Sequence, residues 1–204
     1  MRNLVTRKTL AVPLLLLGFA ALTALSSRAQ SDFSLNGGSV DAGVEYNYVR
    51  ANAAPGVCGC FALNGGSGWV AFNFSHSLAV VGEIASQHAA NISSTGAGLT
   101  LTSFLAGTRY TWTRSGRFAP FAQVLLGGAH ASGTLAPGNS GLAGSSNAFA
   151  LTAGGGLDVG LTRHIALRAI EADYYLTRFA NGINDDQNNL RLAAGLMIRF
   201  GRRR

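Results

Sequence analysis

The segment from Asn189 to Phe200 alternates apolar and polar or small residues almost without a break. One face of this segment carries Leu190, Leu192, Ala194, Leu196, Ile198 and Phe200. The other face carries Asn189, Arg191, Ala193, Gly195, Met197 and Arg199. A period of two residues predicts an extended β-strand whose two faces meet different surroundings. Because a tilted strand of about 11 residues can cross a bilayer, this segment is long enough to span a membrane.

The first 29 residues have the pattern of a cleaved secretory leader. A basic beginning (Arg2 to Lys8) precedes an apolar run from Leu10 to Leu25, and the small residues Ser27 and Ala29 end the segment. The alternative is a transmembrane anchor, but the run is short and contains Pro13. We therefore expect residues 1–29 to be a signal peptide and residues 30–204 to form one mature domain.

Removing this leader lowers the net charge of the chain. Four of the 16 lysine and arginine residues precede residue 30, which leaves 12 against nine acidic residues and a net charge of +3. Three of the remaining arginines are the last three residues, and the others are scattered without a basic stripe among aromatic residues. We therefore expect no nucleic-acid partner.

The mature sequence contains eight segments with a period of two. They cover residues 39–50, 68–75, 79–89, 99–113, 118–131, 147–161, 165–179 and 189–200. The connections between them alternate between long and short. Lengths of roughly 9 to 15 residues disfavour the alternative fold, a secreted β-sandwich, in which strands average about five or six residues.

Several motifs, in this order, resemble the small outer-membrane β-barrel family of the OmpA-like type. They are Gly68-Trp69 to Phe74, Leu78 to Glu83, Ala119 to Ala122, Leu126 to Ala129, Gly154 to Val159, and Arg168 to Phe179. The resemblance covers essentially the whole mature chain. It implies an all-β fold, an eight-stranded antiparallel up-and-down barrel in the outer membrane of a two-membrane bacterium, and it implies no reaction. The short turns and both termini would face the periplasm, and the longer loops would face outside.

The resemblance also implies partners. The last strand is similar to the C-terminal assembly signal of such barrels at Gly195, Ile198 and Phe200, although a Gly-Arg-Arg-Arg tail follows here. It therefore implies the barrel assembly machinery as a partner and outer-membrane lipid as the surroundings of a monomer.

Polar residues occupy the face of the strands opposite the apolar one. They are Glu45, Glu83, Arg109, Gln123, Asp158, Glu171, Asp173 and Arg191. Eight strands leave an interior just wide enough for side chains to fill, so we expect these residues to form hydrogen-bonded ion pairs that plug the lumen. We expect Arg109 to meet Glu83. We expect Arg191 to meet Glu45 or Glu171. A narrow gated conduit is the alternative.

Cys58 and Cys60 lie in the first long loop. Two thiols in an oxidising compartment usually pair, so we expect a disulfide, with a free or redox-labile pair as the alternative because a one-residue spacer strains the ring. No histidine or further cysteine stands nearby, so we expect no metal site.

Two short motifs could suggest an enzyme. His130-Ala131-Ser132 superficially resembles the His-x-Ser of lipid A deacylases, and Ser86-Gln87-His88 offers the same residue types. Neither has a nearby carboxylate to orient the histidine. The glycine-rich runs at 127–128 and 154–156 lie inside strands and open no helix, which excludes a phosphate-binding loop.

The sequence therefore predicts a non-enzymatic barrel without a cofactor. Its function would lie in envelope structure or in an unknown extracellular partner of its surface loops. The alternatives are a narrow passive or gated channel and a lipid-modifying enzyme.

Overall fold

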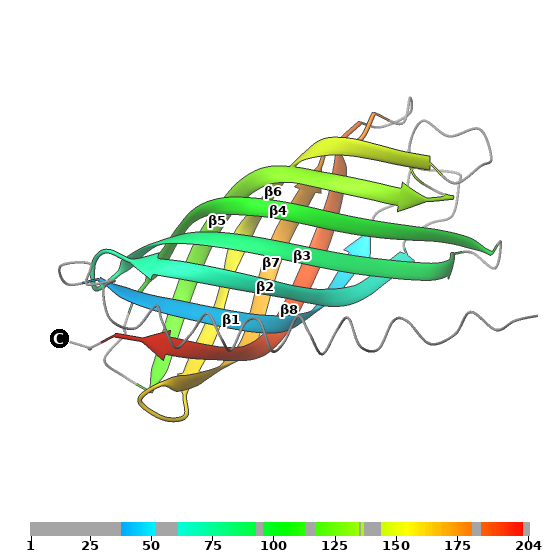
Figure 1. Cartoon of the computed structure of the whole chain (residues 1–204). Coiled ribbons are helices and arrows are strands. Elements are labelled where there is room, and N and C mark those ends of the chain that lie inside the picture. The colour runs from blue at the N-terminus through cyan, green and yellow to red at the C-terminus, as the bar shows by residue number, and fades with distance from the viewer. Residues whose placement is uncertain are drawn as a thin grey trace, which may run out of the picture. The chain divides into compact units, whose positions relative to one another are not determined.

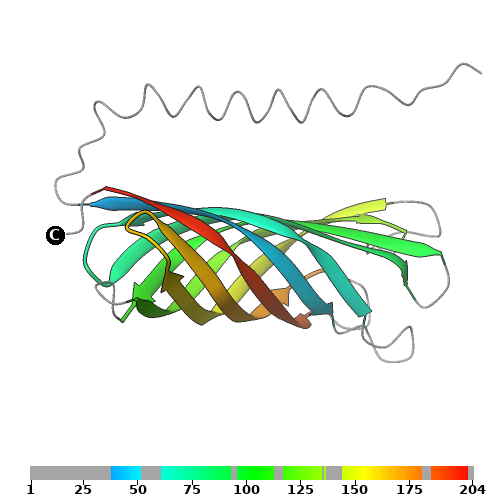
Figure 2. The same cartoon turned by 90° about the horizontal axis from the view of Figure 1, so that it is seen from below.

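The chain folds into a closed antiparallel barrel of eight strands, each paired with its neighbours in sequence, with β1 closing on β8. This computed structural model describes residues 38–51, 61–92, 96–112, 117–134, 136, 144–180 and 185–201. Figures 1 and 2 show the closure, with β1 (blue) beside β8 (red). The expected signal peptide, Cys58 and Cys60 lie outside the described residues.

The eight-stranded all-β prediction is confirmed. The strands are β1 (Ser39–Ala51), β2 (Phe61–Asn73), β3 (Leu78–Ile92), β4 (Ala97–Thr111), β5 (Phe118–Gly133), β6 (Gly144–Gly160), β7 (Ile165–Thr177) and β8 (Gln187–Phe200). Within the described ranges, no helix is long and apolar enough to cross a membrane.

The start of β2 differs from the prediction. β2 begins at Phe61, although residues 61–67 were expected to belong to a loop. This part of the chain contains Gly65, Gly66 and Ser67, a composition typical of loops. Here the glycine serves close strand pairing, because a Cβ atom on Gly65 would lie 2.0 Å from the carbonyl oxygen of Ser86 in β3. β3 is also longer than predicted and β4 begins two residues earlier, which shortens the connection between them.

The outer surface of the barrel is an apolar belt. Its exposed side chains alternate with buried ones along the strands, on the face that the sequence predicts except in the first part of β7. Aromatic side chains mark its edge near the chain termini. They are Phe74, Tyr110, Trp112, Phe118 and Phe200. Amphipathic rings are typical of the boundary between hydrocarbon and water, so the belt has the organisation of a lipid-facing surface.

Four aromatic residues face inward. Each lies near an end of a strand as the sequence predicts it, which favours the outer girdle, but the structure buries Trp69, Phe121, Tyr175 and Phe179. Within a strand the side-chain direction follows the period of two. Trp69, for example, lies between the outward Gly68 and Val70. The period of two, and not the position along the strand, therefore determines whether an aromatic side chain faces inward or outward.

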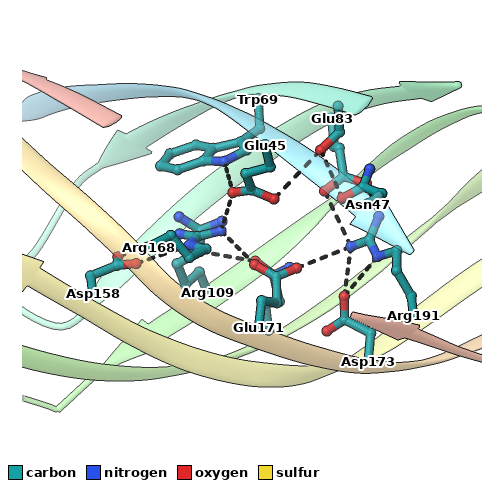
Figure 3. Close-up of polar contacts among 12 residues, drawn as sticks. Glu45, Asn47, Trp69, Glu83, Arg109, Asp158, Arg168, Glu171, Asp173 and Arg191 are labelled. Carbon is teal, nitrogen blue, oxygen red and sulfur yellow. Dashed lines mark hydrogen bonds and ion pairs between the residues drawn. The ribbon is translucent and has the colours of Figure 1, made fainter. Parts of the chain in front are cut away.

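The side chains that face the interior of the barrel are arranged in layers. Near the long-loop end it contains apolar side chains, including Val49, Leu63 and Leu101. Toward the turn end lie small apolar side chains such as Ala71 and Ala79. Most of the buried charged residues gather into one cluster in the interior (Figure 3), whereas Asp41 is level with Ala71 toward the turn end.

Candidate functional site

Arg168 of β7 anchors one half of a buried ion-pair network. Its Nη1 atom lies 2.8 Å from Oε1 of Glu45 and 2.5 Å from Oε2 of Glu171. Its Nε atom donates to Oδ1 of Asp158 over 2.9 Å. Only 1% of the arginine side chain is exposed. One guanidinium group thus pairs with carboxylates from β1, β6 and β7 across the lumen (Figure 3).

Arg191 of β8 anchors the other half. Its Nη2 atom lies 2.6 Å from Oδ2 of Asp173 and 3.1 Å from Oε1 of Glu171. Its Nη1 atom also pairs with the Glu83 carboxylate on β3. Glu171 receives both arginines and therefore joins the two halves into one network.

Arg109 of β4 lies at the edge of this network. Its Nε atom donates to Oε1 of Gln123 over 2.9 Å, and the Gln123 amide donates to Oε1 of Glu171 over 2.9 Å. The Arg109 Cζ atom is 4.3 Å from the ring centroid of Trp69 and 4.8 Å from that of Phe121. Arg168 contacts the same two rings, at 4.5 and 4.2 Å. The aromatic faces stabilise two neighbouring cations by cation–π interaction.

The tryptophan also fixes the position of a carboxylate. Trp69 Nε1 donates a hydrogen bond to Oε1 of Glu45. Gly43 provides the space for this ring, since a Cβ atom at Gly43 would lie 2.6 Å from ring carbons of Trp69. The indole therefore binds the carboxylate with its edge and the guanidinium groups with its face.

The structure places all eight of the predicted lumen residues in the interior. Their exposed fractions are 6% or less. They are Glu45, Glu83, Arg109, Gln123, Asp158, Glu171, Asp173 and Arg191. The predicted set did not include Arg168 and Trp69. Asn47 and Asp41 were also not in the set, although the alternation of residues 39–50 places both on the face of Glu45. Asp41 accepts a hydrogen bond from Asn73 over 2.9 Å.

The predicted contact between Arg109 and Glu83 is not formed. In the pairing of β3 with β4, Glu83 lies opposite Leu105, whereas Arg109 lies opposite Ala79. Four residues of strand separate the two positions, about 13 Å along the strand. Glu83 instead meets Arg191 across the lumen. The Arg191 contact with Glu171, one of the two partners considered, is present.

Arg168 was missed because β7 contains a bulge. The pairing with β8 shifts between Arg168 and Glu171, and both Ala169 and Ile170 point outward. A bulge inserts one residue and changes which face later residues occupy. Counting back from Ile170 with a strict period of two places Arg168 on the wrong face. The detectable signal is that Leu167 and Ile170 are both apolar but three residues apart.

Three carboxylates of the network could in principle hold a cation. One oxygen each from Glu45, Glu83 and Glu171 lies within 4.8 Å of the others. Each of these groups already pairs with Arg168, Arg191 or both. The guanidinium groups supply the charge that a metal ion would supply, so the absence of a metal site stays our prediction.

The two histidine motifs lie on the outer wall. His130 Nδ1 is 2.7 Å from Oδ1 of Asn147, and His88 Nδ1 is 2.9 Å from Oγ1 of Thr100. Ser132 shares the outward face with His130. Among the described residues, no hydrogen bond joins the Ser132 hydroxyl to His130, and the histidine is held by an amide. The base and nucleophile of an acyl-transfer site are therefore not connected here.

Gly195 permits the closure of the barrel between β1 and β8. It pairs with Glu45, and a Cβ atom there would lie 2.1 Å from the carbonyl oxygen of Val44 and 2.6 Å from Cγ of Glu45. The sequence identifies Gly195 as part of an assembly signal. The structure adds a local reason for glycine at this position.

Gly195→Ala is expected to destabilise the barrel by about 1–3 kcal/mol, because the added methyl group overpacks the contact between β1 and β8. The measurement is the urea midpoint of the protein folded in lipid vesicles. Gly82→Ala is the matched control, since a Cβ atom at Gly82 meets nothing within 4 Å. Equal midpoints for the two variants would contradict the packing role.

An exposed ion pair lies beyond the end of β7. Arg178 Nε is 2.7 Å from Oδ1 of Asp186, and the two side chains are 59% and 48% exposed. The hydrogen bond and charge of Asp186 raise the pKa of Arg178. Water screens such a pair, so it contrasts with the buried network.

The closed barrel, the apolar belt and the charged interior together define a β-barrel of the transmembrane class. The sequence matches the outer membrane protein beta-barrel domain family over residues 16–200, and the chain belongs to this family. Its location is the outer membrane of a Gram-negative bacterium.

Solved structures support the fold. The attachment invasion locus protein Ail of Yersinia pestis, in complex with a heparin analogue, is 17% identical with a TM-score of 0.55, covering 80% of this chain and 99% of that one. Neisserial surface protein A is 16% identical with a TM-score of 0.54, covering 80% and 97%. OprG of Pseudomonas aeruginosa is 12% identical with a TM-score of 0.50, covering 81% and 97%. No curated protein matches the sequence.

Proposed function

We propose that this protein is a non-enzymatic component of the outer membrane whose lumen is closed by its own side chains. Its role would then lie in envelope structure or in contacts made by its outer loops. The observation that carries this proposal is the pair of arginines, Arg168 and Arg191, which cross the lumen to carboxylates that are no more than 6% exposed.

The energetics of the network support closure. A hydrated ion needs a continuous polar path, and opening one here requires separating guanidinium groups from carboxylates in a low-dielectric interior. Removing one partner from a buried pair typically costs about 3–5 kcal/mol. The two arginines share Glu171, so disturbing one contact disturbs both halves. Apolar side chains such as Leu63 and Leu101 lie toward the long-loop end.

Ion conductance tests this proposal. The protein, folded in detergent and inserted into a planar lipid bilayer, is expected to give no stable conductance steps. Arg168→Ala and Arg191→Ala serve as comparisons in the same bilayer. Reproducible steps from the unaltered protein that these variants enlarge would show that the arginines line a passage, and the closed-lumen proposal would be wrong.

A narrow passive or gated channel is the second candidate function. The observation that favours it is a set of buried polar atoms without a hydrogen-bond partner among the described residues. They include the Gln87 amide, the amide nitrogen of Asn47 and the hydroxyl of Thr152. Buried polar groups of this kind are commonly satisfied by ordered water. Water on the lumen side of these groups would form part of a conducting path, and the bilayer experiment distinguishes the two functions.

A further inference from the structure

The outer wall of β3 to β6 carries two rows of polar side chains. Register pairs join Ser86, Thr102, His130 and Asn147 in one row. The row above contains His88, Thr100, Ser132 and Ser145. We call these eight residues the polar ladder. Each points away from the lumen and is partly or fully exposed.

Hydrogen bonds within the polar ladder run between strands. Ser86 Oγ lies 3.1 Å from Thr102 Oγ1, and His88 Nδ1 lies 2.9 Å from Thr100 Oγ1. His130 Nδ1 lies 2.7 Å from Asn147 Oδ1. These contacts use only part of the hydrogen-bonding capacity of hydroxyl, imidazole and amide groups. The remaining donors and acceptors face outward.

The apolar belt changes to the polar ladder between two neighbouring register rows, which are two residues apart along each strand. The row directly below the ladder contains Ile84, Phe104 and Phe149, which are 57%, 57% and 44% exposed. The boundary thus follows one register row across β3, β4 and β6. β7 pairs with β6 only as far as Ala150, so the part of β6 that carries Ser145 and Asn147 extends beyond β7.

The height of the ladder places it at the membrane surface. The aromatic edge near the termini includes Trp112, which follows β4 directly. A strand rises about 3.3 Å per residue and tilts about 40° in such barrels, so the segment from Trp112 to Thr102 covers about 25 Å along the membrane normal. The apolar band of outer-membrane barrels is also about 25 Å tall. On β4 the ladder therefore begins where the hydrocarbon ends and the headgroups begin.

The chemistry of the ladder matches a sugar better than an ion. Its eight members are serine, threonine, histidine and asparagine, with no lysine, arginine or acidic residue among them. Neutral donors and acceptors at fixed spacing suit the hydroxyl groups of a saccharide. The ladder continues the lipid-facing belt without interruption, which makes a membrane lipid its natural occupant.

We propose that the polar ladder binds the saccharide headgroup of a glycolipid in the outer leaflet of the outer membrane. The belt below it receives the acyl chains of the same lipid, and the ladder hydrogen-bonds the first sugars. This site is on the outer wall and is independent of whether the lumen conducts, so the bilayer experiment above and the test below can fail separately.

Titration of the folded protein in phospholipid nanodiscs with deep-rough lipopolysaccharide tests the proposal. The double variant Thr102→Val with His130→Phe removes polar groups from the ladder and is expected to weaken binding about tenfold. Thr108→Val is the matched control, because Thr108 lies on the same strand and faces outward within the apolar belt. It is expected to bind like the unaltered protein.

The arms of the experiment separate sugar from charge. Lipopolysaccharide with its phosphates removed is expected to bind as well as the intact lipid, and anionic phosphatidylglycerol is expected not to compete. Equal affinity for the double variant and Thr108→Val would overturn the proposal. Competition by phosphatidylglycerol would also overturn it, since the wall would then recognise anionic lipid in general.

Discussion

Arg168→Ala is expected to lower the free energy of unfolding by about 3–5 kcal/mol, because it leaves buried carboxylates without their cation. The side chains of Glu45 and Glu171 are 1% and 0% exposed, and neither can recover solvation without opening the barrel. The measurement is urea unfolding of the protein in lipid vesicles, followed by tryptophan fluorescence and by heat-modifiable migration on gels.

Arg178→Ala is the matched control for Arg168→Ala. Arg178 is likewise ion-paired at close distance, with Asp186, but both side chains are about half exposed. Its loss is expected to leave the unfolding midpoint unchanged, since water already solvates both groups. Should Arg168→Ala unfold at the same urea concentration as Arg178→Ala, the buried network would contribute nothing to stability.

The face of the strand that each residue occupies could be predicted, because it depends on local alternation in the sequence. In β8, Leu192 and Leu196 meet the outside while Arg191 meets the lumen, as the period of two requires. A closed barrel of eight strands has two environments, the lumen and the outer surface, and each side chain faces one of them. The predicted interior residues follow from this alone, without knowledge of their partners.

The partners could not be predicted in the same way. Arg109 and Glu83 lie on neighbouring strands, but strand neighbours need not be level, and long side chains reach across the lumen. Arg191 meets Glu83 although β8 and β3 are not adjacent in the sheet. Which pairs form depends on the stagger of the strands, which the sequence pattern does not contain.

Irregularities account for the remaining misses. The bulge at Ala169 and Ile170 reverses the phase within β7 and brings Arg168 inward. In β2, glycine both resembles a loop by composition and permits close strand contact, as at Gly65. The bulge in β7 and the glycine in β2 both depend on contacts between strands. Local sequence propensity does not contain these contacts, so it predicted the wrong face for Arg168 and a loop at Gly65.

Leu126→Arg is expected to destabilise the folded barrel by about 2–4 kcal/mol, because it places a charge near the middle of the apolar belt. Leu126 is 55% exposed on the outer wall of β5, on a register line with Ala106 and Leu151. By the strand rise used above, Leu126 lies about 10 Å below His130 of the polar ladder on the same strand. The measurement is the urea midpoint in vesicles. The control is Ser132→Arg on the same strand and face but at headgroup level, where the cost falls to about 0–1 kcal/mol. The cost of an arginine can depend on its depth only if a bilayer surrounds the barrel. Equal costs for the two arginines would therefore show that the belt does not face hydrocarbon at this depth, and the placement of the polar ladder would fail with it.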